Sequence, residues 1–272
     1  MFNMEIILQF HKANSGRRLR KSLPPAGVTY DQFLQMSNDE KYNLMDKIIK
    51  DDNIKVPDYL DDSASTKVIY ALGMNNKPTV VSDSELDKIP GNDLYRGIRD
   101  NSDFNISAKE IADQLKYNEY TQLSKKGSSL LGRGIYFAPN DFLVALDYAS
   151  AYNLVNNGLI IRAKINPNAK MSTVKKIGNK IKEDSMFNKT FLPKETREKV
   201  LNNPHFYYSI SAVTPDSYAL YAIAHGIDGW RDSTINEVIM INRRALTFSS
   251  TNKRAVYKSG GMNTSWTKSE DF

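Results

Sequence analysis

The most informative part of the chain is residues 132–138, which read GRGIYFA. Two glycines bracket a bend, and the aromatic residues that follow alternate across a strand. Tyr136 and Phe137 therefore face opposite sides, so that one ring can pack in the core while the other lines a pocket. The face of a tyrosine ring suits a flat, positively charged partner. An ordinary core position explains Tyr136 equally well when this stretch is taken alone.

Short strand-like runs and well-capped helices surround this stretch. Strands are expected at residues 94–98, 134–138, 159–165 and 238–241. Helices are expected to begin at the capping residues Ser37, Ser63, Ser82, Ser107, Asn140 and Thr214. The two kinds of element are mixed without a regular βαβ alternation, so the sequence predicts an α+β fold.

The pattern of expected elements changes after the Pro90-Gly91 turn, from helices to short strands separated by helices. Residues 1–88 combine a basic arm, in which residues 11–21 read HKANSGRRLRK, with a helical region. Residues 89–272 contain the expected strands. We therefore expect a domain boundary between these two parts, although the N-terminal helices could also pack onto the same core.

The composition narrows the possible chemistry. The chain has no cysteine, which excludes disulfides, thiolate nucleophiles and zinc–thiolate sites. Its three histidines form no His-Glu-x-x-His pair, so no metal site is expected. Catalysis would have to use carboxylates, hydroxyls, basic side chains or aromatic rings. The net charge of +6 helps to attract an anionic partner but does not specify one.

With 40% hydrophobic residues, the chain can bury a core and is expected to be globular. No apolar run approaches the roughly 18–20 residues of a membrane helix, so no membrane partner is expected. At the N-terminus a short apolar stretch precedes positive charge, which is the reverse of a secretory signal. We therefore expect the protein to act in a cytoplasm.

Residues 127–134 imitate a phosphate-binding loop without satisfying its chemistry. The Lys-Ser/Thr pair that would reach the phosphates and magnesium is replaced by Arg133-Gly134. The same glycines fail as a dinucleotide-binding fingerprint, because Phe137 occupies the third glycine position and a strand follows where a helix should open. Both interpretations are rejected.

Arg96 and Gly97 lie within a strand-like apolar run at residues 94–98, LYRGI. An arginine inside such a run is explained if its planar guanidinium faces an anion in a cleft. Gly97 lets the backbone approach a ligand closely and offer its N–H and C=O groups. The alternative is an edge-strand arginine followed by a turn glycine, which is common when such a pair is considered alone.

Glu237 opens the very apolar strand expected at residues 238–241, VIMI. A partly desolvated carboxylate is unfavourable there unless it has a partner or a function. In glycosidic-bond chemistry, such a carboxylate binds a sugar hydroxyl and stabilises an oxocarbenium-like transition state. The alternative is a glutamate at a strand end that pairs with a nearby lysine or arginine.

Taken together, these segments resemble the ADP-ribosyltransferase superfamily over roughly residues 89–250. Residues 95–97, YRG, look like the first motif of its Arg-Ser-Glu branch, which includes clostridial and ecto-enzyme transferases. Residues 132–138 look like the second motif of the His-Tyr-Glu branch, the poly(ADP-ribose) polymerase type. Residues 236–246, NEVIMINRRAL, look like the third, glutamate-bearing strand, and residues 225–230, HGIDGW, like the approach to it. The combination is a hybrid Arg-Tyr-Glu site.

The resemblance implies a split β-sheet core with an N-terminal helical extension, and it implies NAD as the substrate. The residues that would bind NAD are Arg96, Gly97, Gly134, Tyr136 and Tyr148. Arg96 would hold the phosphate and ribose, and the backbone of Gly97 would bind the nicotinamide amide. Tyr136 would stack on the nicotinamide ring, and Tyr148, one position out of step, would cover its other face. The catalytic residues would be Glu237, Arg96 and Tyr136.

Two positions depart from the family pattern and bear on the acceptor. Relatives that modify arginine or asparagine carry Glu or Gln two residues before the catalytic glutamate, where this chain has Ile235. The serine that contacts nicotinamide in polymerase-type sites is replaced by Val144. We therefore expect transfer of a single ADP-ribose, or hydrolysis of NAD, rather than polymer formation, with arginine a poor acceptor.

The expected function is mono-ADP-ribosylation of a macromolecular target, with a protein favoured over a nucleic acid. Two alternatives stay open. One is an ADP-ribosyltransferase fold that serves as a binding or structural module without turning over NAD. The other is a nucleic-acid ADP-ribosyltransferase, for which the basic residues 164–199 offer a surface. Small transferases without cysteine resemble bacterial toxins and phage-carried effectors, whose site of action would be a host cytoplasm.

Overall fold

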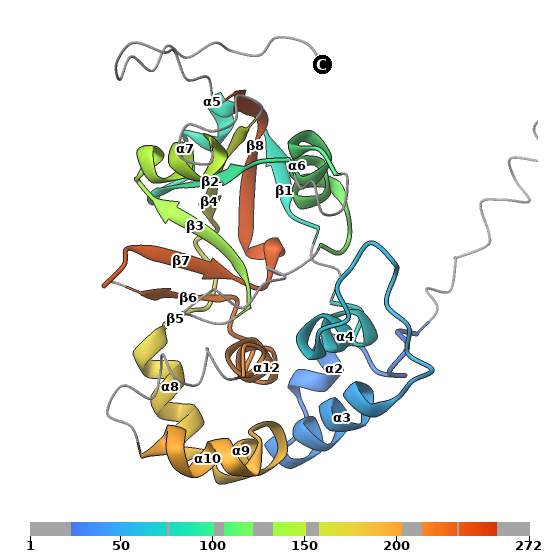
Figure 1. The fold of residues 1–272 in the computed structure, drawn as a ribbon. Coiled ribbons are helices and arrows are strands. Elements are labelled where there is room, and N and C mark those ends of the chain that lie inside the picture. Colours follow the sequence, from blue (N-terminus) through green and yellow to red (C-terminus); the bar gives the residue numbers. More distant parts are fainter. Residues whose placement is uncertain are drawn as a thin grey trace, which may run out of the picture.

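The structure is a computed structural model that describes residues 23–74, 77–100, 106–121, 133–150, 158–202, 214–232 and 234–254. Within these residues, helices and strands combine into an α+β fold, as the sequence predicts. Figure 1 shows a divided sheet above a group of helices that surround α12. The basic arm at residues 11–21 and the glycine-rich residues 127–132 lie outside the described part.

The described strands form one mixed sheet of eight strands in the order β1-β8-β4-β2-β3-β7-β6-β5. Their bounds are β1 (Thr79–Val81), β2 (Asp93–Ile98), β3 (Ile135–Pro139), β4 (Leu159–Ile165), β5 (Met171–Thr173), β6 (Gly229–Asp232), β7 (Glu237–Met240) and β8 (Leu246–Arg254). The pairs β1–β8 and β5–β6 are parallel, and the other described pairs are antiparallel. All the strands expected from the sequence are confirmed, with small shifts at their ends.

The sheet divides between β2 and β3. In the described residues, these strands pair only at Leu94 with Pro139 and at Tyr95 with Ala138. Beyond that point β2 continues beside β4, whereas β3 continues beside β7. One half-sheet therefore consists of β1, β8, β4 and β2, and the other of β3, β7, β6 and β5. The two halves run in different directions in Figure 1.

The described helices are α2 (Tyr30–Leu34), α3 (Asn38–Lys50), α4 (Ala64–Ala71), α5 (Asp83–Leu86), α6 (Ala108–Tyr117), α7 (Phe142–Ser150), α8 (Val174–Glu183), α9 (Ser185–Phe191), α10 (Lys194–Leu201) and α12 (Ser217–Ala224), with a 3₁₀ turn, η1, at Arg243–Ala245. Local capping decides where several of them begin. Ser37, Ser63, Ser82 and Ser107 each accept a hydrogen bond from the backbone N–H three residues later, as the sequence predicts.

Two expected helix starts are wrong. Asn140 does not cap α7: its φ is 53°, and its side-chain carbonyl accepts a backbone N–H from the start of β2. The cap is Asp141, whose carboxylate accepts the backbone N–H of Val144. Helix α12 begins at Ser217, because the carbonyl of Thr214 accepts hydrogen bonds from Ser217 in a turn that precedes the helix. In the first case, a contact between distant segments takes the capping group away from the helix.

The half-sheet that contains β2 and β4 is covered on both faces. Helix α6 packs into the main hydrophobic core together with Ile161 of β4. Helix α7 packs with the neighbouring residue, Ile160, in a smaller cluster. Because consecutive residues of a strand face opposite sides, α6 and α7 cover opposite faces of β4.

The N-terminal helices belong to the main core. Helices α3 and α4 contact α12, and α3 also contacts α9. Their buried residues Tyr42 and Val68 lie in one cluster with Tyr218 and Trp230. Strand β1, which also precedes the expected boundary, pairs with β8. The residues on the two sides of the expected boundary near residue 88 therefore share a continuous core. The catalytic role of residues 89–272 stays a prediction.

Candidate functional site

The point at which β2 leaves β3 brings Arg96 opposite Tyr136. Nη1 of Arg96 donates a hydrogen bond to the backbone carbonyl of Tyr136 at 2.9 Å, so the guanidinium bridges the gap between the strands. Burial lowers the pKa of Arg96, and the electrostatic effects of Tyr136, Tyr148 and Glu237 act in the opposite direction. Side chains from β3, α7 and β7 are therefore near enough to act electrostatically on this guanidinium of β2, and all of them were singled out by the sequence.

Arg96 keeps hydrogen-bonding capacity for a ligand. The side chain is partly buried, and its Nε has no hydrogen-bond partner in the part of the chain that the structure describes. A buried donor without a partner is unfavourable, so an acceptor atom that reached it would stabilise it, although this nitrogen is closed to solvent in the structure. A phosphate or ribose oxygen is an acceptor of that kind.

Gly97 lies beneath helix α7. A Cβ at this position would overlap the carbonyl of Ala145 and lie 2.6 Å from the backbone nitrogen of Ala149. The helix can approach the strand this closely because residue 97 has no side chain. Residues four apart in a strand direct their N–H and C=O groups to the same side, so Asp93 and Gly97 share one side of β2. The carbonyl of Asp93 accepts a hydrogen bond from the backbone N–H of Asn140, which directly follows β3. The N–H and C=O of Gly97 therefore point into the gap that β3 leaves.

Two tyrosines border this gap. Tyr136 of β3 is half-buried and points away from the buried Phe137, as the alternation of the strand predicts. Tyr148 of α7 is 54% exposed, and its Cβ borders the Cα of Gly97. The site thus offers phenol rings from a strand and from the helix that covers it.

Glu237 is the first residue of β7 and lies directly opposite Asp232 of β6. Its carboxylate is half-buried and forms no ion pair with any residue that the structure describes. Burial and the charge of Asp232 raise the pKa of Glu237, whereas Arg96 lowers it. The described residues therefore do not show the alternative interpretation, in which Glu237 pairs with a basic side chain at the strand end.

Gly134 has a packing role in the structure. A Cβ there would overlap the side chain of Ile239 and lie 3.3 Å from the carbonyl of Met240. Gly134 therefore allows β3 and β7 to pack closely. Its contact with NAD stays a prediction, and Gly132 lies outside the described residues.

Arg133 anchors the start of β3, a role that the sequence did not reveal. Its guanidinium forms ion pairs with Asp61 at 2.7 Å and with Asp216 at 3.2 Å. Its backbone N–H donates to the carbonyl of Pro215 at 2.9 Å. These contacts tie the start of β3 to the segments before α4 and α12. The partner Asp61 is 72 residues away along the chain, so no local pattern could have indicated the pair.

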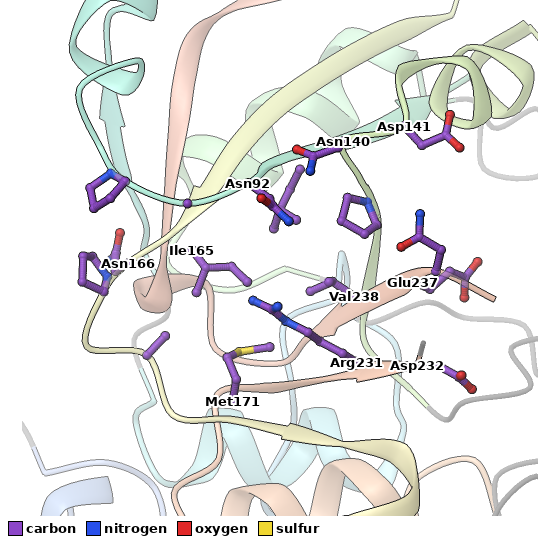
Figure 2. Close-up of a pocket in the computed structure, with 17 residues that line it drawn as sticks. Asn92, Asn140, Asp141, Ile165, Asn166, Met171, Arg231, Asp232, Glu237 and Val238 are labelled. Atoms are coloured by element: carbon purple, nitrogen blue, oxygen red, sulfur yellow. The ribbon is translucent and has the colours of Figure 1, made fainter. Parts of the chain in front are cut away.

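A pocket of about 750 Å³ opens between the two half-sheets (Figure 2). Glu237 lines it, whereas Arg96, Gly97, Gly134, Tyr136 and Tyr148 do not. The strand register explains this separation for Tyr136 but not for Arg96, which shares a face of β2 with Leu94, a residue that lines the pocket. Phe137 lies opposite Val238, and Val238 lies opposite Arg231, so these residues share the face that borders the pocket. Tyr136 lies on the other face, and Glu237 lies at the strand end between the pocket and the Arg96 site.

Ile235 and Val144, the two residues that the sequence singled out for their lack of polar groups, are both at the surface. Ile235, in the turn before β7, is 43% exposed, and Val144, on α7, is 39% exposed. An aliphatic side chain can neither accept a proton nor polarise a nucleophile. At residue 235 the chain therefore carries no group that could activate an acceptor, and at residue 144 it carries no hydroxyl that could hydrogen-bond to a ligand.

No group of three or more histidine, aspartate or glutamate side chains in the described ranges is arranged to bind a metal ion. Within the same ranges, no helix combines the length and the apolar character needed to cross a membrane. Comparison with known proteins found no matching family model, no matching curated protein and no matching solved structure. The functional argument therefore rests on the residues and geometry of the site.

Proposed function

We propose that this protein cleaves NAD at the nicotinamide–ribose bond and transfers the ADP-ribose to a macromolecular target, as a mono-ADP-ribosyltransferase. The observation that carries the proposal is the grouping of Tyr136, Tyr148 and Glu237 around Arg96 where the sheet divides. This grouping supplies a cation, aromatic rings and a carboxylate to one ligand. These are the groups that a pyrophosphate, a nicotinamide ring and a reacting ribose require.

The geometry supports the proposed binding roles. Arg96 uses Nη1 for the Tyr136 carbonyl, so its other N–H groups can donate to the pyrophosphate and ribose of NAD. The N–H and C=O of Gly97 suit the carboxamide of nicotinamide, which both accepts and donates hydrogen bonds. Tyr136 and Tyr148 flank the position that the ring would occupy.

Glu237 supplies the negative charge that the reaction requires. When the glycosidic C–N bond breaks, its electron pair leaves with nicotinamide, and positive charge moves onto the ribose. A carboxylate that binds a ribose hydroxyl stabilises this oxocarbenium-like state more than it stabilises bound NAD. The nucleophilic atom of the acceptor then bonds to the ribose carbon and gives up its proton. Water as the nucleophile gives hydrolysis.

Incubation with NAD and measurement of free nicotinamide tests the proposal. Glu237→Gln is expected to abolish nicotinamide release while keeping NAD affinity within about tenfold, because a lost transition-state contact lowers the rate more than the affinity. Arg96→Ala is expected to weaken NAD binding instead, since it removes a charge-assisted contact. Glu183→Gln is the matched control, because the Glu183 side chain is 64% exposed on α8.

Several outcomes would decide against the proposal. If Glu237→Gln keeps most of the rate, Glu237 is not the catalytic carboxylate. If Arg96→Ala leaves the affinity for NAD unchanged, Arg96 is an ordinary strand residue. If the unaltered protein binds NAD without releasing nicotinamide, the alternative of a catalytically silent module is favoured.

The acceptor is proposed to be a protein group other than arginine. A guanidinium acceptor needs a nearby carboxylate to orient or deprotonate it, and the exposed Ile235 cannot do so. With labelled NAD, free arginine and arginine analogues are therefore expected to be poor acceptors. Brisk labelling of free arginine by the unaltered protein would contradict this. Labelling of a nucleic acid, with a steep salt dependence between roughly 50 and 200 mM, would establish the alternative acceptor.

A further inference from the structure

A positively charged side chain with no partner among the described residues lies in the pocket beside Glu237. Arg231 of β6 forms no hydrogen bond or ion pair with any residue that the structure describes. Figure 2 shows its side chain extending from the strand into the space between Ile165, Met171 and Val238. The guanidinium is therefore exposed to the pocket, above a partly apolar floor.

The strand register explains how the charge comes to lie there. Arg231 is directly opposite Val238, which is 1% exposed, so its side chain points to a face that is largely apolar. Asp232 follows it in the sequence, but consecutive residues of a strand point to opposite faces. The sheet thus keeps the adjacent carboxylate away from the guanidinium. A cation held in this way is available to an anion from outside the chain.

The rest of the pocket has the character of a small-molecule site. Its volume of about 750 Å³ falls within the roughly 300–1,000 Å³ that such sites occupy. Leu94, Ile165 and Met171 contribute apolar surface. Asn92 and Asn236, both exposed at the rim, have side-chain amides that form no hydrogen bond within the described ranges. Apolar walls with a few polar and charged groups are typical of sites that bind a small molecule.

We infer that this pocket binds a small organic oxyanion, a molecule with a phosphate or carboxylate group on an apolar body, and that Arg231 is its anchor. The planar guanidinium can donate two parallel N–H groups to such an oxyanion. Glu237, Asp232 and Asp141 also line the pocket and repel a second negative charge, so the uncharged end of the ligand would lie near them. This site adjoins the one proposed for NAD at Glu237, but its anchor, Arg231, has no part in the proposed binding of NAD.

Isothermal titration calorimetry on the full chain tests the inference with two groups of probes. One group consists of phosphate monoesters, AMP and glucose 6-phosphate, and the other of carboxylates, succinate and citrate. Saturable binding is expected in one group, and it distinguishes the two sources of the oxyanion. Arg231→Ala is expected to weaken that binding about tenfold or more, because it removes a charge-assisted pair of hydrogen bonds. Arg231→Lys is expected to be intermediate, since it keeps the charge and loses the planar fork.

Matched variants separate this site from the site proposed for NAD. Arg96→Ala is expected to leave the affinity for the probe unchanged, because Arg96 does not line the pocket. Arg244→Ala removes one exposed positive charge elsewhere and is likewise expected to have no effect. The unfolding temperature of Arg231→Ala is expected to match that of the unaltered protein, because the side chain is exposed and unpaired in the described structure.

Two results would overturn the inference. One is the absence of saturable binding in both groups of probes. The other is saturable binding of a probe whose affinity is the same for Arg231→Ala and for the unaltered protein. If the affinity of that probe falls with Arg96→Ala instead, the probe binds at the site proposed for NAD. Neither result bears on nicotinamide release, so failure of this inference is distinguishable from failure of the proposed function.

Discussion

Glu237 lies in surroundings that are unfavourable for a carboxylate. It is half-buried, it faces Asp232 directly across β6 and β7, and no basic side chain of the described structure pairs with it. Both burial and Asp232 raise its pKa. Residues that destabilise a fold are often retained where they act on a ligand. The unfavourable surroundings of Glu237 are in line with the catalytic role proposed for it.

Replacement of this carboxylate is expected to stabilise the fold at neutral pH. Folding raises the pKa of this carboxyl group above its ordinary value of 4.5. The group therefore contributes to the stability of the folded state below pH 4.5, and this contribution is lost as the pH rises through the pKa of the folded state. Glu237→Gln removes the charged form. Thermal unfolding is therefore expected at a higher temperature for the variant at about pH 7.5, with little difference at about pH 4. A lower unfolding temperature for the variant at neutral pH would contradict the assigned environment.

At the scale of elements, strand β3 depends on contacts outside the sheet. Arg133, at its start, joins Asp61 and Asp216 from two other segments. Asp61 is 4% exposed, and its carboxylate also accepts hydrogen bonds from Ser63 and Thr66. The strand that carries Tyr136 is thus positioned by the N-terminal helical region. This connection gives those helices a part in building the site.

Removal of one member of this buried group is expected to be costly. Arg133→Ala leaves the Asp61 carboxylate buried without its cation, and this is expected to lower the free energy of unfolding by roughly 3 kcal/mol. Lys109→Ala is the matched control, because it breaks the exposed ion pair with Asp113 and should cost about 0.5 kcal/mol or less. Chemical denaturation measures both. Equal effects of the two variants would show that the Arg133 group does not hold β3.

At the scale of the whole molecule, a polar cluster joins the helices that surround α12. The hydroxyl of Tyr42 on α3 donates to Asp184 at 2.6 Å and lies 3.0 Å from Nε2 of His225, which follows α12. Asp184 also caps α9. Since the Tyr42 hydroxyl donates to Asp184, Nε2 of neutral His225 is the donor to Tyr42. The cluster therefore links α3, α9 and α12.

This cluster predicts a pH dependence of stability. Burial, followed by the charge of Lys41, lowers the pKa of His225 below its ordinary value of 6.5, and Asp184 opposes the shift. The unfolded chain then binds a proton that the folded chain does not, so the contribution of His225 is complete above pH 6.5 and is lost as the pH falls. Thermal unfolding between about pH 8 and pH 5 is expected to show this loss. His225→Gln should flatten the profile, and an identical slope in the variant would exclude His225 as its source.

Local structure was largely predictable from the sequence. The serine caps at Ser37, Ser63, Ser82 and Ser107 act within three residues of the chain, so their signal is complete in the sequence. Strands β2 and β4 were predicted because their apolar runs are long enough to stand out. The short strands β1, β5 and β6, and the more polar β8, were not predicted. They are strands because of the partners beside them in the sheet.

By itself, then, the sequence determined the α+β class, most helix starts, and the residue types of a site built from Arg96, Tyr136 and Glu237. The tertiary structure alone decided that these side chains gather where β2 and β3 separate, that Arg133 reaches Asp61, and that a pocket containing Arg231 opens between the two half-sheets beside Glu237. The physical reason is distance along the chain. Capping and periodicity act between near neighbours, whereas the site and the pocket come from strand pairings and side-chain contacts between segments far apart in the sequence.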